Sequence, residues 1–260
     1  MNRPLSGKRI LVTRPADQSS GLASRIAACG GQAECFPLID IAPPQDWRAM
    51  DEAIARLETF AIVIFISPNA ASFGLGRLLS RRSWPERVAA AALGPGTAGV
   101  LAEAGVAGVI APRGRYDSEA LLSLDLLGAG RIAGQGVLIV RGDGGRDLLA
   151  ETLRARGARV ECVPCYRRSP PRDGAPLVSM LRGRALDAVT LSSTEGLRNL
   201  LQLLDTGSRE RLLDLPVFVS HRRIANEAAR RGLRRVVLTG PEDGGLVTGM
   251  CTYRWADHER

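Results

Sequence analysis

Short apolar runs alternate along most of the chain with segments that carry an amphipathic pattern. Residues 61–66 and 88–93 are apolar at every position, which is typical of strands buried on both faces of a parallel sheet. Between such runs apolar residues recur at helical spacing, as Met50, Ile54 and Leu57 do within 46–57. The alternation predicts an α/β fold in which helices cover both faces of parallel sheets.

The N-terminal stretch 10–41 and the central stretch 137–168 carry the same pattern. Each has an apolar strand, a turn, an amphipathic helix that ends at glycine, and an extended segment. Aligned without gaps, Arg14 falls on Arg141 and Cys35 on Cys162, 127 positions apart, and nine of the 28 pairs from Ile10 to Pro37 are identical. Because 127 is close to half of the 260 residues, the repeat predicts two similar domains.

The order of the strand–helix units determines how the two predicted domains are built. If the extended segments cross between domains, the first unit must join the C-terminal units, and the central copy must complete the middle domain. We therefore predict two similar parallel-sheet α/β lobes of flavodoxin-like type, with 1–35 and 168–260 forming a discontinuous lobe 1 and 40–162 forming lobe 2. Linkers at about 33–41 and 160–168 would pair as a two-stranded extended ribbon, with Cys35 and Cys162 on neighbouring strands.

The second half of the chain repeats the elements predicted for the middle. Strands are expected at 188–191, 217–219 and 235–238, as counterparts of those at 61–66, 88–93 and 106–110. In this alignment Ser67 corresponds to Ser192 and Gly94 to Ser220. The last residues, 251–260, match none of these elements and are expected to form a frayed tail.

The formal charge of +8 limits the classes of partner that need to be considered. Lys8 is the only lysine, and an arginine-rich excess is explained either by genome composition or by attraction to a polyanion. Nucleic acid is disfavoured, because aromatic residues make up only 4% of the chain and no predicted helix carries a basic stripe. No apolar run approaches the ~18 residues of a membrane helix and no leader-like segment precedes the first strand, so we expect a cytoplasmic protein without membrane contact.

Cys162 and Cys165 form a C-x-x-C motif, which is compatible with a redox pair or half of a metal site. A structural role is favoured, because the pair ends a predicted strand instead of starting a helix and Cys162 is the repeat counterpart of Cys35. His221 and His258 are the only histidines. We therefore expect no metal site.

Ligands of open parallel sheets bind beyond the carboxyl ends of the strands, so the predicted strand–helix turns are the candidate binding sites. These turns combine glycine or hydroxyl residues with the N-terminus of the next helix, an arrangement that suits carboxylates and phosphates. Each hydroxyl residue could equally be a simple helix cap. The candidate residues are Thr13, Arg14, Ser67, Asn69, Gly96, Thr97, Arg141, Gly144, Ser192, Ser193 and Arg222.

Two further motifs are given structural interpretations. The turn at 141–145 is rich in glycine, but it completes neither G-x-G-x-x-G nor G-K-[ST], so nucleotide binding is disfavoured. His221 has no acid or nucleophile placed beside it by spacing, and we interpret it as a solvated turn residue.

Taken in order, several motifs resemble the uroporphyrinogen-III synthase family. They are V-T-R-P at 12–15, F-P-L-I-x-I at 36–41, I-F-I-S-P-N-A at 64–70, L-G-P-G-T-A at 93–98, S-E-A-L-L at 118–122, V-L-I-V-R-G-D-G-G-R-D-L-L at 137–149, L-R-A-R-G-A-R-V at 153–160, C-Y-R-R at 165–168 and S-S-T-E-G-L at 192–197. Their order and spacing extend over nearly the whole chain, to about Gly240.

The resemblance implies a monomeric, cofactor-free enzyme of two lobes that acts on the linear tetrapyrrole hydroxymethylbilane. Its reaction removes a hydroxyl as water and closes the ring to uroporphyrinogen III with inversion of the fourth pyrrole. The carboxylate arms of the substrate would bind the basic turns, with Ser67, Thr97 and Ser192 lining a cleft. Tyr166 matches the family's candidate for assisting departure of the hydroxyl, and the alternative is that Tyr166 only packs between the lobes and shapes the cleft.

The same linear molecule closes unaided to the isomer without inversion, so the resemblance implies that catalysis consists mostly of positioning. Two other functions stay open at this point. One is a non-catalytic, two-lobed binder of a polyanionic metabolite. The other, motivated by the charge alone, is a nucleic-acid-binding protein.

Overall fold

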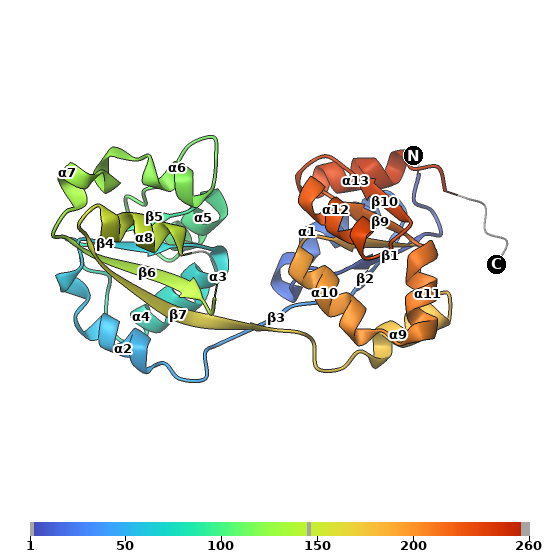
Figure 1. Ribbon diagram of the computed structural model, residues 1–260, viewed down its shortest axis with the longest axis horizontal. Helices are drawn as coiled ribbons and strands as arrows, with labels where there is room; N and C mark the ends of the chain where they lie inside the picture. The colour runs from blue at the N-terminus through green and yellow to red at the C-terminus, as the bar shows by residue number, and fades with distance from the viewer. Residues whose placement is uncertain (1–2, 145–146, 256–260) are drawn as a thin grey trace. The chain divides into compact units, whose positions relative to one another are not determined.

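The computed structural model describes residues 3–144 and 147–255, which divide into two units. Unit 2 is the continuous segment Ile41–Arg168, and unit 1 comprises the described residues of Met1–Asp40 and Ser169–Arg260. Unit 1 is therefore built from both ends of the chain and unit 2 from its middle (Figure 1). Each unit is a largely parallel sheet with helices on both faces, so the predicted fold class is confirmed.

The elements of unit 2 follow the predicted alternation of strands and helices. Its strands are β3 (Asp40–Ala42), β4 (Ile62–Phe65), β5 (Ala89–Ala92), β6 (Gly136–Gly142) and β7 (Arg159–Ser169). Its helices are α2 (Arg48–Ala55), α3 (Pro68–Ala70), α4 (Gly76–Leu79), α5 (Pro95–Glu103), α6 (Ser118–Leu122), α7 (Ala129–Ile132) and α8 (Leu148–Ala155). Short 3₁₀ turns lie at Leu57–Thr59 and Asp125–Leu127, and a π-helical segment, Ala71–Leu75, joins α3 to α4.

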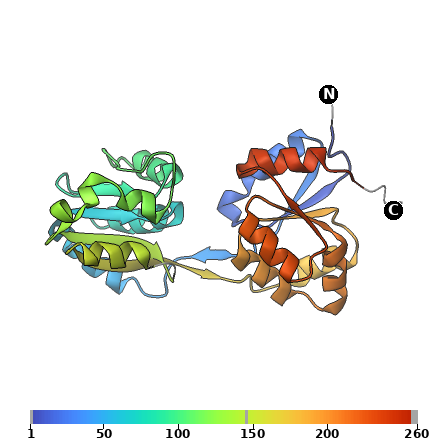
Figure 2. The ribbon, with the colours of Figure 1, turned by 45° about the horizontal axis from the view of Figure 1, so that its top comes forward.

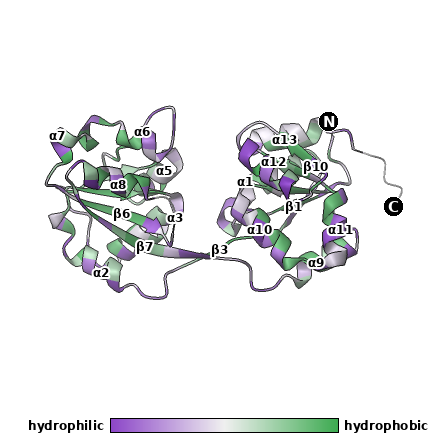
Figure 3. Cartoon of the chain, viewed as in Figure 1, coloured by the Kyte–Doolittle hydropathy of each residue, from purple (hydrophilic) through white to green (hydrophobic). Residues whose placement is uncertain are grey.

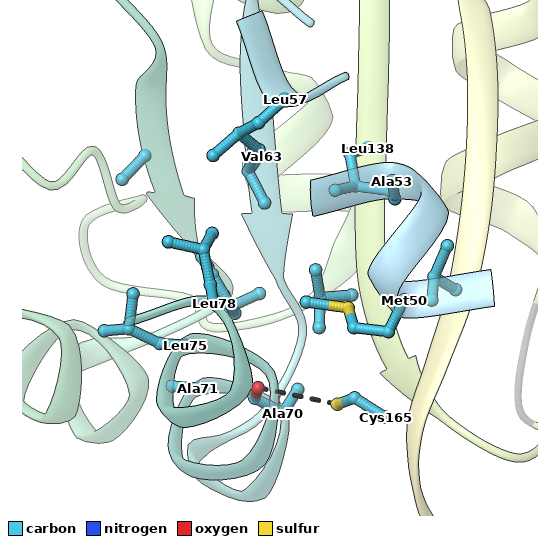
Figure 4. Close-up of a cluster of buried hydrophobic side chains, with 14 of the residues drawn as sticks. Met50, Ala53, Leu57, Val63, Ala70, Ala71, Leu75, Leu78, Leu138 and Cys165 are labelled. Carbon is cyan, nitrogen blue, oxygen red and sulfur yellow. Dashed lines mark hydrogen bonds between the residues drawn. The ribbon is translucent and has the colours of Figure 1, made fainter. Parts of the chain in front are cut away.

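The sheet of unit 2 has the order β3-β7-β6-β4-β5, and β7, β6, β4 and β5 pair in parallel. Successive strand residues point into two different cores. On β4, Val63 and Phe65 pack with α2 to α5, whereas Ile62 and Ile64 pack with α6 to α8. Figure 4 shows the first of these cores, where Met50 of α2 lies beside the strands.

The elements of unit 1 come from two separate stretches of the chain. Its strands are β1 (Arg9–Val12), β2 (Gln32–Cys35), β8 (Ala188–Leu191), β9 (Pro216–Val219) and β10 (Arg235–Leu238). Its helices are α1 (Ser20–Ala28), α9 (Ala175–Arg182), α10 (Thr194–Leu203), α11 (Thr206–Asp214), α12 (Arg222–Arg230) and α13 (Glu242–Thr252), with a 3₁₀ turn at Ala16–Gln18.

The sheet of unit 1 has the order β10-β9-β8-β1-β2, and every neighbouring pair is parallel. Figure 2 shows the blue N-terminal elements of this unit together with its orange and red C-terminal elements. Counted within the unit, this is the flavodoxin-like order 2-1-3-4-5. Ile10 and Val12 pack against α1 and α13, and Leu11 packs on the opposite face with α9 to α12. Figure 3 shows the apolar colour concentrated along the strands of each unit, as expected for strands that are buried on both faces.

The repeat in the sequence is also a repeat in the structure. In unit 1, Val12 lies opposite Cys35 in the β1–β2 pair. In unit 2, Ile139 lies opposite Cys162 in the β6–β7 pair, so both partners are displaced by the same 127 positions. The two copies therefore share one strand register.

The prediction that Cys35 and Cys162 lie on neighbouring linker strands is wrong, because β2 and β7 belong to different sheets. After its helix, each extended segment first returns beside the preceding strand, where its backbone groups find hydrogen-bond partners. The first strand–helix unit nevertheless lies among the C-terminal strands, since β1 pairs with β8. At the edge of the other sheet β3 lies beside β7.

The strand predicted at 106–110 is reduced to a single bridge between Ile110 and Ala91. Gly105 and Gly108 have φ angles of 86° and 65°, in a region that extended strands do not use, so the backbone turns there. Helices α9, α11 and α13 are among those not anticipated from the sequence. In α9, Pro176 lies in the first turn, where a helix does not need the missing N–H group.

The described part of the C-terminal tail is packed, not frayed. The rings of Tyr253 and Trp255 lie 5.3 and 6.0 Å from that of Phe218, and Lys8 Nζ lies 5.3 Å from the Trp255 ring. Residues 256–260 of the tail lie outside the described residues. Within the part of the chain that the structure describes, no helix combines the length and apolar character needed to span a membrane.

Candidate functional site

In each unit the carboxyl ends of the strands form an edge that carries the candidate residues. The strand order reverses between β1 and β8 in unit 1 and between β6 and β4 in unit 2. Beyond such a reversal the connections diverge to opposite faces of the sheet, which leaves room for a ligand. Thr13, Ser192 and Ser193 follow the strands at the first reversal, and Ser67 and Arg141 lie at the second.

Ser67 and Ser193 cap the helices of equivalent turns. The Ser67 Oγ accepts the Ala70 N–H at 3.0 Å, and the Ser193 Oγ accepts the Gly196 N–H at 2.8 Å. Each serine comes two residues after the end of its strand, so aligning Ser67 with the exposed Ser192 is wrong by one residue.

The same one-residue error affects the next turn of each unit. Gly94 precedes α5 and His221 precedes α12, so His221, not Ser220, is the counterpart of Gly94. His221 makes no capping hydrogen bond through its side chain, and both it and Arg222 are exposed.

The N-terminus of α5 presents backbone N–H groups at the edge of unit 2. The first helical bond runs from the Ala98 N–H to the Gly94 C=O at 3.0 Å, so the N–H groups of Gly96 and Thr97 precede it. Gly96 is exposed, whereas the Thr97 side chain is only 3% exposed and has little surface for a ligand. Asn69, in the first turn of α3, is half-buried.

Thr13 joins β1 to β8 at the reversal of unit 1. Its Oγ1 donates to the Thr190 C=O at 2.6 Å, and the Thr190 Oγ1 donates to the Leu11 C=O at 3.0 Å. Both threonines are buried. This reciprocal pair holds the two strand ends together below the turn.

The two arginines that the repeat aligns are both paired with carboxylates. Arg14 pairs with Asp243. Arg141 donates to Asp147 Oδ1 and to the Gly144 C=O, both at 2.7 Å, and is only 8% exposed. Arg141 therefore closes its own turn. The anion site predicted for 141–145 is described only as far as Gly144, because Gly145 lies outside the described residues.

Tyr166 lies in the core of unit 2 and is 1% exposed, because it packs with the residues of α2 to α5. It is not the last residue of β7, which continues to Ser169. It is paired with Gly142 on β6, where an added Cβ would lie 2.6 Å from the tyrosine Cζ. The Phe73 ring stacks on it at 6.2 Å. The Tyr166 hydroxyl lies 3.2 Å from Ser67 Oγ and accepts a hydrogen bond from Arg168 Nη2 at 3.1 Å.

The C-x-x-C cysteines face opposite sides of β7. Cys165 packs in the core with α2 to α5, and Cys162 packs against the core on the other face. Burial raises the pKa of Cys165 to about 12, and its Sγ donates to the Ala70 C=O at 3.6 Å (Figure 4). The two thiols therefore cannot act as one redox pair. Among residues 3–144 and 147–255, no three His, Cys, Asp or Glu side chains gather closely enough to hold a metal ion.

Three residues at these edges were missed by the sequence analysis: Gly142, Arg168 and Thr190. Thr190 gave a signal, because a lone threonine in an apolar strand needs a hydrogen-bond partner. The contacts of Gly142 and Arg168 with Tyr166 gave no signal in the sequence, because they depend on how β6 and β7 pair.

Comparisons with known proteins agree on one family. A family model described as uroporphyrinogen-III synthase HemD matches residues 20–248. The uroporphyrinogen-III synthase of Escherichia coli (strain K12) is 34% identical over 241 residues, which cover 92% of this chain and 97% of that protein. That of Synechococcus elongatus is 35% identical over 207 residues, covering 78% and 76%.

Solved structures share the fold. The uroporphyrinogen-III synthetase of Helicobacter pylori 26695 matches with a TM-score of 0.59 and 14% identity, covering 93% of this chain and 97% of that one. A mutant uroporphyrinogen III synthase of Thermus thermophilus matches with a TM-score of 0.58 and 17% identity, covering 94% and 97%.

Proposed function

The chain belongs to the uroporphyrinogen-III synthase family and is a lyase that closes hydroxymethylbilane to uroporphyrinogen III in porphyrin biosynthesis, and we propose how its residues do so. The match over most of the chain favours this enzyme over a non-catalytic polyanion binder and over a nucleic-acid-binding protein.

The observation that carries the proposed mechanism is the set of helix N-termini at the carboxyl ends of both sheets. The acetate and propionate arms of hydroxymethylbilane end in carboxylates, which backbone N–H groups at a helix N-terminus bind well. Gly96, Ser192 and Arg222 are exposed residues, and their N–H, hydroxyl and guanidinium groups respectively are suited to this contact.

The buried candidate residues would contribute to substrate binding indirectly, by fixing the backbone conformation of their turns. Thr13 and Thr97 are 5% and 3% exposed, so they hold the backbone that a carboxylate would meet. Arg14 and Arg141 are paired with Asp243 and Asp147, and a substrate carboxylate would have to compete with these partners.

Holding one folded geometry supplies most of the catalysis, because the linear substrate closes unaided to the isomer without inversion. Tyr166 supplies the proton for the departing hydroxyl. The chain acts as a monomer, with the tetrapyrrole as its only partner.

Substitutions in α5 test whether backbone N–H groups bind the substrate. Gly96→Val should raise KM several-fold, because a branched side chain crowds the N–H group of residue 96. Thr97→Ala keeps every N–H group and should change KM less. Gly99→Val is the matched control, since Gly99 is exposed in the same helix and an added Cβ meets nothing within 4 Å. The reverse ranking of Gly96→Val and Thr97→Ala would contradict the proposal.

A further inference from the structure

Ser67, Tyr166 and Arg168 form a chain of hydrogen-bonded side chains within unit 2. The Arg168 guanidinium donates to the Tyr166 Oη at 3.1 Å, and that oxygen lies 3.2 Å from the Ser67 Oγ. Arg168 is exposed and Ser67 is half-buried, but Tyr166 between them is 1% exposed. A substrate could therefore hardly reach Tyr166 directly, because this middle residue of the three has almost no exposed surface.

We propose that the Ser67 hydroxyl touches the departing group, that Tyr166 supplies the proton through Ser67, and that Arg168 is the positioning residue of Tyr166. This rests on the role proposed above for Tyr166 in the lyase reaction, and it changes which residue meets the substrate.

Counting donors and acceptors shows that these hydrogen bonds allow a proton to pass from Tyr166 to Ser67. Arginine can only donate, so it occupies a lone pair of the Tyr166 oxygen and leaves the phenol proton to be donated. The Ser67 Oγ already accepts the Ala70 N–H at 3.0 Å. If it also accepts the phenol proton, both its lone pairs are used and its own proton is directed elsewhere.

If the Ser67 hydroxyl donated to the Tyr166 oxygen instead, the phenol proton would need a different acceptor. An added Cβ on Gly142 would lie 2.9 Å from the Tyr166 Oη, and Phe73 stacks on the ring, so the backbone of β6 and a second ring enclose the phenol. Ser67 is the member of the pair that is partly exposed.

The proton transfer balances over the whole reaction. The substrate C–O bond breaks with its electron pair on oxygen, and that oxygen takes the Ser67 proton and leaves as water. Ser67 takes the Tyr166 proton in the same step, and the guanidinium of Arg168 stabilises the resulting phenolate. After ring closure the carbon that formed the new bond loses a proton, which returns through Ser67 to Tyr166.

A double-mutant cycle of Ser67→Ala and Tyr166→Phe tests the relay, with hydroxymethylbilane generated in situ as substrate. General acid catalysis contributes on the order of 10²-fold, so each single variant should lower kcat by about that factor with little change in KM. If the two residues act as one relay, the double variant should be no slower than the slower single variant. Multiplied effects, or an unchanged kcat in Ser67→Ala, would overturn the proposal.

Two further Ser67 variants separate the relay from helix capping, whose loss costs ~1 kcal/mol. Ser67→Asn keeps an acceptor for the Ala70 N–H but has no hydroxyl, so it should be as slow as Ser67→Ala. Ser67→Thr keeps the hydroxyl and should retain most of the activity. A fast Ser67→Asn enzyme would show that only the cap matters and would overturn the proposal.

The role of Arg168 is tested by substitutions that remove or keep its charge, and by making the same substitution in the Tyr166→Phe variant. Arg168→Gln should lower kcat without raising KM, Arg168→Lys should restore part of it, and Arg168→Gln should have no further effect in Tyr166→Phe. The control is Arg154→Gln, which removes another exposed arginine of unit 2 with one Nη2 hydrogen bond. A further loss in the Tyr166→Phe background would overturn the positioning role. Failure of the lyase function itself would be distinguishable, because the unmodified protein would then give only the uncatalysed isomer.

Discussion

Cys165 lies in a motif that is compatible with redox or metal chemistry, but its burial disfavours the thiolate that either would use. It is 0% exposed, its thiol donates to a backbone carbonyl, and burial raises its pKa to about 12. Near pH 8 almost none of it is thiolate, which is the form that reacts. Cys35 differs because it is exposed, although burial and then the charge of Glu34 raise its pKa as well.

We predict that an alkylating reagent modifies Cys35 in the native protein well before Cys165. Mass spectrometry of peptides after timed labelling at pH 8 gives both rates, and labelling in denaturant provides the control in which both thiols react. Equal rates for the two thiols in the native protein would contradict the described burial.

The sequence was informative at residues whose role is local. The serine and glycine turns were recognised because caps act on the next few backbone groups. The neighbours of Tyr166 were not recognised, because its contact with Gly142 depends on a register shift in β6–β7 next to Arg141. Arg168 was part of a quoted motif, yet only the structure shows that it donates to the Tyr166 hydroxyl.

At the scale of elements, the helical segment after Ser67 departs from regular α geometry. The π-helical turn Ala71–Leu75 places Phe73 on Tyr166 and Gly74 against β6. An added Cβ on Gly74 would lie 2.5 Å from Val140 Cγ1, whereas one on Gly76, two residues later, would meet nothing within 4 Å.

These two glycines provide a matched pair of substitutions. Gly74→Ala should destabilise the protein by about 1–3 kcal/mol, because it overpacks the core. Gly76→Ala should stabilise it by about 0.5–1 kcal/mol, because alanine is the better helix former at an exposed position. Urea unfolding measures both. If both substitutions changed the unfolding free energy in the same direction, the close packing of Gly74 on β6 would be contradicted.

Asp51 of α2 predicts a pH-dependent contribution to the stability of unit 2. Arg77 donates two hydrogen bonds to it, at 2.8 and 2.7 Å, and this pairing holds the pKa of Asp51 below its ordinary value. The ionised carboxylate therefore stabilises the fold above the unfolded pKa of about 4, and this stability is lost as the pH falls through the lower folded pKa.

Asp51→Asn should thus lower the unfolding free energy at pH 7, and the difference from the unmodified protein should shrink below about pH 4. Asp46→Asn is the control, because Asp46 is an exposed partner of Arg48 at 3.7 Å. Denaturation at several pH values measures both variants. A difference that grows at low pH would have the wrong sign.

Strands were predicted better than helices for a physical reason. Strand β8 is buried because residues 188–191 are mostly apolar, and this property can be read from the segment itself. Helix α13 is rich in glycine, which opposes helix formation, and it is held by the packing of Leu246 and Met250 in the core of unit 1. Such tertiary support cannot be read from the segment alone.

At the scale of the whole molecule, the two units differ in how the chain builds them. Unit 2 is continuous and contains its own sheet and both of its cores. The internal repeat in the sequence indicated that first units are exchanged. It could not indicate where the connecting segments begin, because a strand continues for as long as its neighbour offers partners.

We expect residues 40–169 to fold as an independent domain, because a unit with its own sheet and cores can in principle fold alone. The isolated fragment should show near-ultraviolet circular dichroism and a single sigmoidal urea transition. A broad transition without tertiary signal would contradict the independence of unit 2.

The measurement that tests the central claim most directly is the isomer composition of the product. Hydroxymethylbilane is generated in situ, the protein is added, and the porphyrins are separated after oxidation, with a reaction lacking the protein as control. The account predicts isomer III, formed faster than the uncatalysed closure. Isomer I alone, formed at the uncatalysed rate, would contradict it.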